Sequence, residues 1–402
     1  MNKLDYNGIL RKQVLNYCDD VSVLIDGFRK GITEPRFLPN TVLSSIKRVL
    51  ITGSGDCWGA SLVLQSVFDD FLGAGGISCE AYTPMELSRF TELTPDDNTT
   101  LIIVLSVWGF PARLVEILKR AAKYHIPSIA ITEKDNSPVG LAADYALNVH
   151  NSSIALESKS GCCTYLGMLI SASLFAAHIS EVKGIRPQGS INALAESLTA
   201  YAEKISKEIE RIDDQIFEIA KCWKDTVEGV IAVGDDTDYA SALFFPAKLI
   251  ESAGIFGGFT DSREWLRSQQ YIGRADRTGA VVYVQQASPS KEHLEKAIEA
   301  AAKRLFPTLV ISDYPCPVKN EYPTVSTVVL PAAPGGQNYI GSFFNHLPAD
   351  LLASYLCEFW GGSYFRSAVI EDTEYGVNHK EGTTLWSKPG INTLQSSQHV
   401  LV

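Results

Sequence analysis

The chain has 402 residues, of which 46% are hydrophobic and 20% are charged, and its formal net charge is −11. A chain of this length usually divides into more than one domain, and an acidic balance without any basic run argues against a nucleic-acid surface. We therefore expect a globular protein of two domains that does not bind nucleic acid.

Residues 4–29 have the apolar periodicity of a helix, and the charged side chains among them do not fit a signal peptide. The most apolar run, at residues 165–179, is short and contains polar residues, so it predicts a buried helix and not a membrane span. The eight cysteines are scattered, and the adjacent pair Cys162 and Cys163 lacks metal-ligand spacing. We expect a cytoplasmic protein with reduced thiols, no bound metal and no contact with a membrane.

Strand and helix patterns alternate in the first half of the chain. Short apolar runs rich in β-branched residues predict strands at residues 48–52, 78–83, 101–105, 128–132 and 145–149. Amphipathic runs between them, such as residues 112–124, predict helices. This rhythm is typical of a parallel sheet that is covered by helices on both faces.

A long helical pattern covers residues 159–178 and 190–224, and its second part is rich in Glu and Lys and is expected to be a solvated connector. The rhythm then restarts with a helix at residues 240–252 and with strands at residues 229–233, 255–259, 280–284, 308–311 and 324–330. We therefore predict an α/β protein of two doubly wound parallel-sheet units in tandem, joined by helices. The domains are expected at residues 1–185 and 186–360. A tail at 361–402 follows, and its aromatic residues favour an arm over a disordered end.

Two glycine-containing loops follow strands of the first predicted sheet. They consist of Gly53, Ser54, Gly55, Asp56 and Cys57, and of Ser106, Val107, Trp108 and Gly109. Glycines let the backbone approach a ligand, the N–H groups at a helix start favour an anion, and ligands of such sheets bind at the carboxyl ends of the strands. A dinucleotide fold is disfavoured because the spacing to Gly59 departs from the G-x-G-x-x-G pattern and no acidic residue ends the second strand. The loops therefore predict a small-molecule site.

Several patterns together resemble the tandem SIS (sugar isomerase) family over about residues 40–360. The two loops look like the family's first glycine loop and its serine-rich phosphate loop, and residues 129–132 with 137–145 are similar to its AIT…SPLA…ADY signature. Residues 247–251 resemble its LKLKE helix end, and residues 263–267 stand where relatives have GELKH. The isomerase half of glutamine–fructose-6-phosphate aminotransferase and the fructoselysine-6-phosphate deglycases are the relatives suggested. The resemblance implies two flavodoxin-like SIS units.

The resemblance implies proton transfer without a metal or redox cofactor. A glutamate at the position of Glu251 moves a proton between C1 and C2 of an open-chain sugar, through an enediol or enolamine, which requires a carboxylate of suitable pKa. Lys248, one turn earlier, could hold Glu251 or the developing oxyanion. Glu264 and Arg267 complete the implied catalytic set, but relatives have a ring-opening histidine where this chain has Arg267. An arginine stays protonated at neutral pH and would bind a carboxylate instead.

The resemblance also implies a binding set and an assembly. The substrate-binding residues would be Ser54, Gly55, Asp56, Cys57, Ser106, Val107, Trp108, Gly109, Leu156, Glu157, Ser158 and Lys159. The ligand would be a small sugar derivative. A homodimer or larger homo-oligomer is expected because the family's sites draw residues from neighbouring subunits. In the tail, Lys380 or Lys388 could reach over the sugar, as a C-terminal lysine does in relatives, with His379 beside Lys380.

The loops depart from the family pattern where a phosphate would bind. Cys57 replaces a serine, and Val107, Trp108 and Pro111 replace a glutamine, a serine and a threonine. Each lost hydrogen bond to a charged group is worth about 1.5–3 kcal/mol, and Asp56 adds a negative charge. A phosphate would therefore lose much of its side-chain anchoring.

Two interpretations of these departures stay open. Either Lys159, Arg113 or a neighbouring subunit holds the phosphate, or the ligand carries none and Trp108 stacks on a sugar ring or an apolar group. In the second case, a sugar–amine conjugate with an acid group would suit Arg267.

Simpler interpretations apply to the same residues. Without the resemblance, Glu251 and Lys248 would be an ordinary surface pair at a helix end, and Trp108 would be a core residue. The scattered histidines are expected on the surface or in the core: His125, His293 and His346.

The function predicted is that of an aldose–ketose isomerase or deglycase, acting on a sugar phosphate or an amino-sugar (Amadori-type) conjugate. A non-catalytic protein that binds carbohydrate derivatives through a degenerate SIS site is the alternative. Amide transfer from glutamine is not expected, since no glutamine-hydrolysing segment precedes the first unit.

Overall fold

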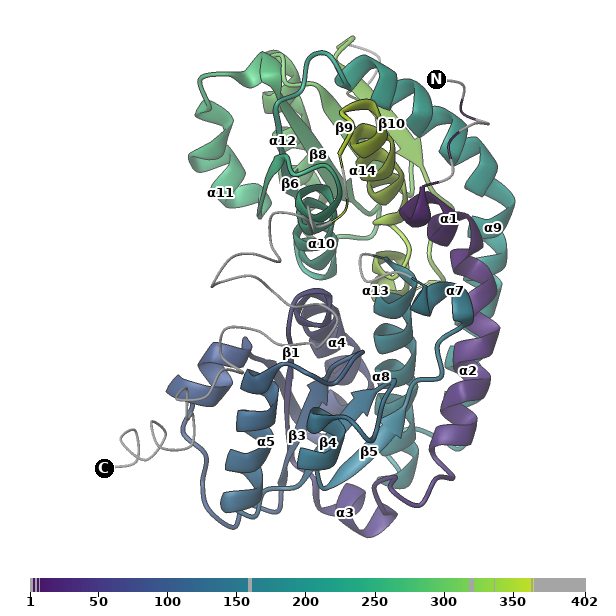
Figure 1. Cartoon of the computed structure of the whole chain (residues 1–402), viewed down its shortest axis with the longest axis vertical. Helices are drawn as coiled ribbons and strands as arrows, with labels where there is room; N and C mark the ends of the chain where they lie inside the picture. The colour runs from purple at the N-terminus through teal and green to yellow at the C-terminus, as the bar shows by residue number, and fades with distance from the viewer. Residues whose placement is uncertain are drawn as a thin grey trace. The chain divides into compact units, whose positions relative to one another are not determined.

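The computed structural model describes residues 3, 6, 8–157, 161–316, 318, 322–335, 337–362 and 364, and these form two compact units (Figure 1). Among the described residues, the first-sheet unit consists of Asp20–Ser153 and Thr164–Glu196. The second-sheet unit consists of those within Met1–Asp19, Ile154–Cys163 and Ser197–Ser367. Each unit therefore contains segments that are separate in the sequence, whereas the sequence pattern predicts one division after residue 185. The predicted tail lies outside the described residues except for Gly361, Gly362 and Tyr364.

The first-sheet unit is built on a five-stranded parallel sheet with the strand order β2-β1-β3-β4-β5. The strands are β1 Arg48–Gly53, β2 Ser78–Ala81, β3 Thr100–Leu105, β4 Ser128–Thr132 and β5 Tyr145–Asn148. Its helices are α2 Asp20–Gly31, α3 Asn40–Ser45, α4 Asp56–Leu72, α5 Ala112–Lys123, α6 Pro138–Ala142 and most of α8 Cys163–Val182, with short turns η3 Gly73–Gly75 and η4 Glu86–Phe90. Gly53 at the end of β1 pairs with Leu105 at the end of β3, so the two predicted loops follow neighbouring strand ends.

The second-sheet unit repeats this plan with the strand order β10-β9-β8-β6-β7, again all parallel. The strands are β6 Gly229–Val233, β7 Phe256–Thr260, β8 Thr278–Val284, β9 Thr308–Ser312 and β10 Val325–Val329. Its helices are α1 Ile9–Asn16, α10 Thr237–Ser252, α11 Ser262–Arg267, α12 Lys291–Lys303, α13 Asn338–Ser342 and α14 Leu347–Phe359, with short turns η2 Tyr17–Asp19, η5 Gln269–Tyr271 and η6 Ala275–Arg277. Helices α7 Ser153–Leu156 and α9 Ser190–Trp223 contribute residues to both units. The predicted pair of doubly wound α/β units is confirmed.

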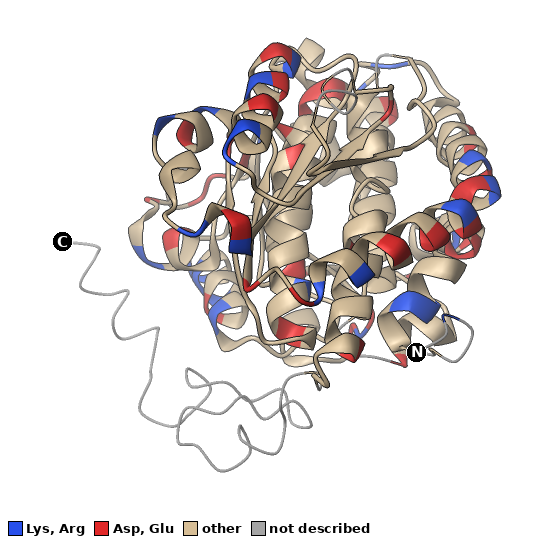
Figure 2. Ribbon diagram, turned by 90° about the horizontal axis from the view of Figure 1, so that it is seen from above, with Lys and Arg blue, Asp and Glu red and all other residues tan. Residues whose placement is uncertain are grey.

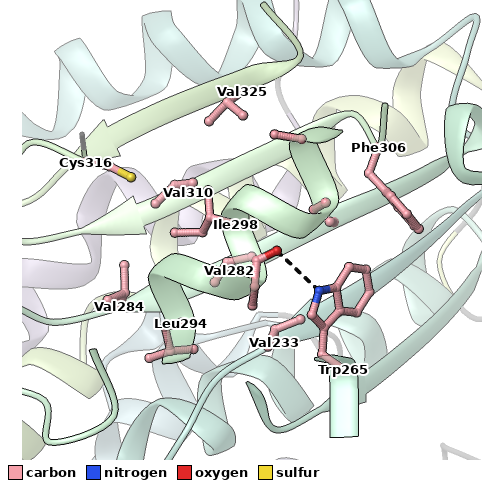
Figure 3. Close-up of a cluster of buried hydrophobic side chains, with 14 of the residues drawn as sticks. Val233, Trp265, Val282, Val284, Leu294, Ile298, Phe306, Val310, Cys316 and Val325 are labelled. Carbon is pink, nitrogen blue, oxygen red and sulfur yellow. Dashed lines mark hydrogen bonds between the residues drawn. The ribbon is translucent and has the colours of Figure 1, made fainter. Parts of the chain in front are cut away.

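One face of the second sheet is covered by α11 and α12 (Figure 3). Trp265 of α11 is fully buried and donates its indole N–H to the carbonyl oxygen of Ala297 in α12, with an N···O distance of 3.3 Å. The same ring meets Phe306 edge-on, with 5.2 Å between the ring centroids. Val233 of β6 and Val282 of β8 belong to this apolar cluster. The middle of α11 is therefore fixed to the core.

Two helical predictions need correction. The N-terminal helical run is interrupted by the turn Tyr17–Asp19. Helix α9 is not solvated all round, because Leu198, Ile205, Ile212 and Ile216 form a buried stripe along its 34 residues. The high Glu and Lys content of α9 therefore does not mean that the helix is exposed on every side, because the helix is amphipathic.

The charged residues of the protein as a whole lie mostly on helices and loops, with both signs interspersed (Figure 2).

Helix α8 is long and apolar enough to cross a membrane by length and composition alone. Its most apolar stretch is 94% buried within the protein. Burial of this kind is typical of the core helix of a soluble protein, and it agrees with the buried helix predicted at residues 165–179.

A buried carboxyl group anchors the first turn of α10. The oxygen Oδ1 of Asp238 accepts hydrogen bonds from Gln285 Nε2 at 2.6 Å, Asn345 Nδ2 at 2.8 Å and Ser342 Oγ at 2.9 Å. Burial raises the pKa of Asp238 from 3.8 to about 6, although the three hydrogen bonds oppose the rise. These bonds tie the start of α10 to the end of β8 and to α13.

The raised pKa predicts a pH-dependent stability. The fold favours protonated Asp238, so this contribution is fully present below pH 3.8 and is lost as the pH rises through about 6. The rise corresponds to up to about 3 kcal/mol, at about 1.4 kcal/mol per pH unit. In Asp238→Asn the amide oxygen keeps the three hydrogen bonds and the charge is gone. Urea unfolding between pH 4 and 7 should therefore show the wild type losing stability relative to this variant.

A matched control is Asp276→Asn, which alters an exposed carboxyl group in η6. Its difference from the wild type should not change with pH. An equally flat difference for Asp238→Asn would contradict the raised pKa.

Candidate functional site

The first glycine loop connects β1 to the start of α4. Gly53 must lack a side chain, because a Cβ there would lie 2.5 Å from the Cβ of Cys57. Gly55 has a φ of +63°, which favours glycine, and nothing lies within 4 Å of the position its Cβ would take. Ser54 and Gly55 are exposed, Asp56 is partly buried and Cys57 is buried. The loop therefore exposes its backbone directly before the 17-residue helix α4, and the Cys57 side chain is packed in the interior.

The second loop follows β3 and is held by its own side chains. Ser106 is buried, and its Oγ accepts a hydrogen bond from the backbone N–H of Gly109 at 3.2 Å. Gly109 has a φ of +74°, and a Cβ there would lie 1.8 Å from Ser137 Oγ. Val107 is buried, and its carbonyl oxygen accepts a hydrogen bond from Glu133 N at 3.1 Å. The Ser106 hydroxyl therefore already shapes the loop.

A lysine that the sequence analysis missed lies at this loop. The Nζ of Lys134 is 5.2 Å from the centroid of the Trp108 ring, which is a cation–π contact. Lys134 is exposed and comes just after β4, so the adjacent ends of β3 and β4 bring the two residues together. The ammonium group of Lys134 therefore lies over one face of the Trp108 ring, so this face differs from the open stacking surface that was predicted.

The predicted phosphate partner Arg113 is engaged elsewhere. Its guanidinium contacts the carboxylate of Glu116, and Arg89 forms a second ion pair with the same carboxylate. The Glu116 side chain is fully buried. Arg113 therefore balances an internal charge, and the structure does not support it as the anchor of a phosphate.

In the second-sheet unit, Lys248 and Glu251 form an ion pair on α10 in which only the cation is fully buried. Lys248 Nζ lies 2.9 Å from Glu251 Oε2, and the exposed fractions of the two side chains are 0% and 27%. Lys248 Nζ also lies 4.9 Å from the centroid of the Phe244 ring. The simpler interpretation as a surface pair is wrong, because the cation is fully removed from water.

Close packing on β7 sets the position of this pair. A Cβ on Gly257 would lie 2.8 Å from the Cβ of Pro246, which is inside α10 just before Lys248. Helix α10 also packs against β6, β8 and α14. The glycine lets the helix approach the strand directly.

The other implied catalytic residues are on a different helix. Glu264 and Arg267 are exposed on α11, which packs against α12 through Trp265. Asp261 caps that helix by accepting a hydrogen bond from Glu264 N at 2.8 Å. The structure joins Lys248 to Glu251, whereas α10 and α11 pack against different elements.

The remaining predicted residues are only partly described. Leu156 ends α7, and the exposed Glu157 forms an ion pair with Lys12, with an N···O distance of 2.9 Å. Ser158 and Lys159 lie outside the described residues, as do His379, Lys380 and Lys388 of the tail.

A small cleft lies at the carboxyl edge of the second sheet. Its walls include Tyr201, Gln285, Asp313 and Asn345, and none of the predicted site residues lines it. Gln285 and Asn345 belong to the hydrogen-bond network of Asp238.

Comparisons with known proteins agree with the predicted fold. A scan against models of protein families finds no match. The chain is 23% identical over 219 residues to the glutamine–fructose-6-phosphate aminotransferase (isomerizing) of Corynebacterium diphtheriae, and this match covers 54% of the chain and 33% of that enzyme. The chain thus spans about a third of the length of the curated relative that it matches.

Solved structures share the fold at low sequence identity. The C-terminal domain of glucosamine-fructose-6-phosphate aminotransferase from Francisella tularensis has a TM-score of 0.74 at 16% identity, covering 90% of this chain and 99% of that one. Tagatose-6-phosphate ketose/aldose isomerase from Escherichia coli has a TM-score of 0.67 at 12% identity, covering 90% and 95%. The chain therefore has the fold of the tandem SIS proteins and resembles the isomerase half of glutamine–fructose-6-phosphate aminotransferase.

Proposed function

We propose that this protein is an aldose–ketose isomerase of sugar phosphates in which Glu251 transfers the proton between C1 and C2. The observation that carries the proposal is the pair on α10, a fully buried ammonium group 2.9 Å from a carboxylate that stays 27% exposed. The exposed part lets the carboxylate meet a ligand, and the buried cation holds it in place. Likeness in fold to a ketose/aldose isomerase and the match to an isomerizing aminotransferase support the proposal.

The reaction needs one base and no electron acceptor. Glu251 would take the proton from C2 of the open-chain aldose, and the C–H electron pair would form the C1–C2 double bond of an enediol as O1 gains a proton. Glu251 would then give its proton to C1 while O2 loses one and C2 becomes the carbonyl. Lys248 would hold this carboxylate in place by donating a hydrogen bond to its Oε2.

We propose that Lys134 contacts the phosphate of the substrate. A phosphate is stabilised by the N–H groups at a helix start, and α4 starts directly after the exposed Gly55. Ser106 and Arg113 are already engaged within the protein, and Asp56 opposes an anion. The exposed ammonium of Lys134 supplies the missing positive charge at the neighbouring loop.

Finer assignments are proposals as well. An Amadori-type conjugate would react through an enolamine by the same proton transfer, and the exposed guanidinium of Arg267 suits a substrate carboxylate. We also propose a homodimer or larger homo-oligomer in the cytoplasm.

The variant Glu251→Gln tests the catalytic role. Isomerisation across a panel of sugar phosphates, free sugars and Amadori-type conjugates should fall by about 10²–10⁴-fold, because the amide cannot accept the proton. Exchange of the C1 or C2 hydrogen with solvent deuterium, followed by NMR, should fall equally. Ligand binding should be kept.

A matched control is Glu218→Gln in α9, where an exposed glutamate pairs with Lys221 at the same helical spacing. It should leave turnover unchanged. If Glu251→Gln keeps its turnover, the proton-transfer role is excluded. If the wild type binds sugars but neither isomerises them nor exchanges deuterium, the protein is a binding protein.

The variant Lys134→Ala tests the phosphate contact. Calorimetric titration should show at least about tenfold weaker binding of a sugar phosphate, since a hydrogen bond to a charged group is worth about 1.5–3 kcal/mol. Binding of the matching unphosphorylated sugar should not change.

Lys123→Ala is the control, because the Nζ of Lys123 also lies over a ring, 5.9 Å from the centroid of Tyr124. It should bind both ligands as the wild type does. Equal affinity of the wild type for the phosphorylated and free sugar would contradict a phosphate site.

A further inference from the structure

The small cleft in the second-sheet unit lies where sheets of this kind bind their ligands. Val284 at the end of β8 pairs with Ser312 at the end of β9, and both residues line the cleft. Ligands of doubly wound sheets bind outside the carboxyl ends of the strands. None of the described residues that we assign to isomerisation lines the cleft, so a ligand here would be a second one.

The walls of the cleft combine aliphatic and polar side chains that are almost fully buried. Ile311 and Leu330 provide apolar surface. The polar side chains include Tyr201 of α9, Gln285 and Asn345, which are only 1%, 7% and 6% exposed. The cleft is therefore formed by the packed interior of the unit and not by exposed side chains that happen to lie apart.

The hydroxyl groups in these walls already use their hydrogens within the protein. The hydroxyl of Tyr201 donates to the carbonyl oxygen of Pro331 at 2.8 Å, and Ser312 Oγ donates to the carbonyl oxygen of Tyr314 at 2.6 Å. A hydroxyl group has one hydrogen and two lone pairs. Toward a ligand, both groups can therefore act only as acceptors.

The amide group of Gln285 is oriented in the same sense. Its Nε2 donates to Oδ1 of the buried Asp238 at 2.6 Å. Its Oε1 lies beside Gly341, where an added Cβ would be only 2.6 Å away, and Gly341 also lines the cleft. The amide thus directs its nitrogen into the interior and its oxygen toward the wall of the cleft.

A carboxylate adds a negative charge to these acceptors. Asp313 directly follows β9, and its Oδ1 accepts a hydrogen bond from Gln286 N at 2.6 Å. Burial raises the pKa of Tyr201 and the charge of Asp313 adds to the rise, which agrees with their place in the same cleft. The described residues that line the cleft include no Lys, Arg or His. The cleft is therefore an acceptor-lined, negatively charged site.

We propose that this cleft binds a primary ammonium group. Such a group offers N–H donors to walls whose hydroxyl and amide groups present acceptors, and the carboxylate of Asp313 balances its charge. A phosphate or a carboxylate would meet no cation here. Because the cleft is small, it takes the cationic head of a ligand. The free ammonium ion and the amino group of a larger amine share this chemistry.

Urea unfolding at pH 7 and constant ionic strength tests the proposal with the chlorides of ammonium, methylammonium, potassium and choline. Ammonium at about ten times its dissociation constant should lower the unfolding equilibrium constant about tenfold relative to choline, and the effect should saturate. Potassium carries the same charge but donates no hydrogen bond, so it should act as choline does. Methylammonium should match ammonium if the cleft takes the amino group of a larger molecule, and should fail if it takes the free ion alone.

Two variants locate the effect in the cleft. Asp313→Asn should raise the dissociation constant of ammonium at least about tenfold, since a hydrogen bond to a charged group is lost. Ala333→Val adds methyl groups to a lining residue and should weaken binding without changing any charge. The control Asp276→Asn, which alters an exposed carboxyl group in η6, should respond to ammonium as the wild type does.

Three results would overturn the proposal. Equal effects of potassium and ammonium would show that charge alone is recognised. Equal effects of ammonium and choline would show that the cleft holds only water. An unchanged ammonium effect in Asp313→Asn would place the binding elsewhere, and Ala333→Val decides the point if Asp313→Asn does not fold. These measurements need no turnover, so a failure of the proposed isomerase activity would not affect them.

Discussion

A fully buried ammonium group is the constraint on which the second-sheet unit depends. Removing a charge from water costs several kcal/mol per ion, so Lys248 requires compensation. Glu251 supplies part of it directly, and the Phe244 ring adds a cation–π contact. All three groups lie on α10, which packs against β6, β7, β8 and α14, so the packing of this helix and its charge balance depend on each other.

The first-sheet unit shapes its two loops with few side chains. The loop conformations depend on Gly53, Gly55 and Gly109, and the Ser106 hydroxyl stabilises its own loop by accepting a hydrogen bond from Gly109 N. Polar groups that could have bound a ligand are used internally, as the Arg113–Glu116 pair shows. The proposed phosphate site would therefore rely on backbone N–H groups and on the charge of Lys134, which follows the neighbouring strand β4.

The fold was largely predictable because its strands are short, buried and bounded by glycine or polar residues. The β-branched runs at 48–52 and 128–132 became β1 and β4 within one residue of their predicted ends. The helix α9 differs from the solvated connector predicted because its high Glu and Lys content hides its apolar periodicity. Its buried stripe of leucine and isoleucine was present in the sequence at helical spacing.

The site was less predictable, since burial and pairing across strands are not local properties. The spacing of Lys248 and Glu251 put them on one side of a helix, but an apolar helix such as α10 does not reveal which side faces the interior. Lys134 meets Trp108 only because β3 and β4 are adjacent in the sheet. The resemblance to sugar isomerases pointed to Glu251, and its role as the base stays a prediction.

The position of the proposed base, Glu251, depends on a residue that has no side chain, Gly257. At Gly257, α10 rests on the strand with no side chain between them, and the missing methyl group sets the height of the helix above the sheet. A misplacement of about 1 Å at a reacting centre can cost about a hundredfold in rate. In the proposed reaction, a substitution as small as Gly257→Ala would therefore shift Glu251 through the packing of α10 on β7, without altering any group that takes part in the chemistry.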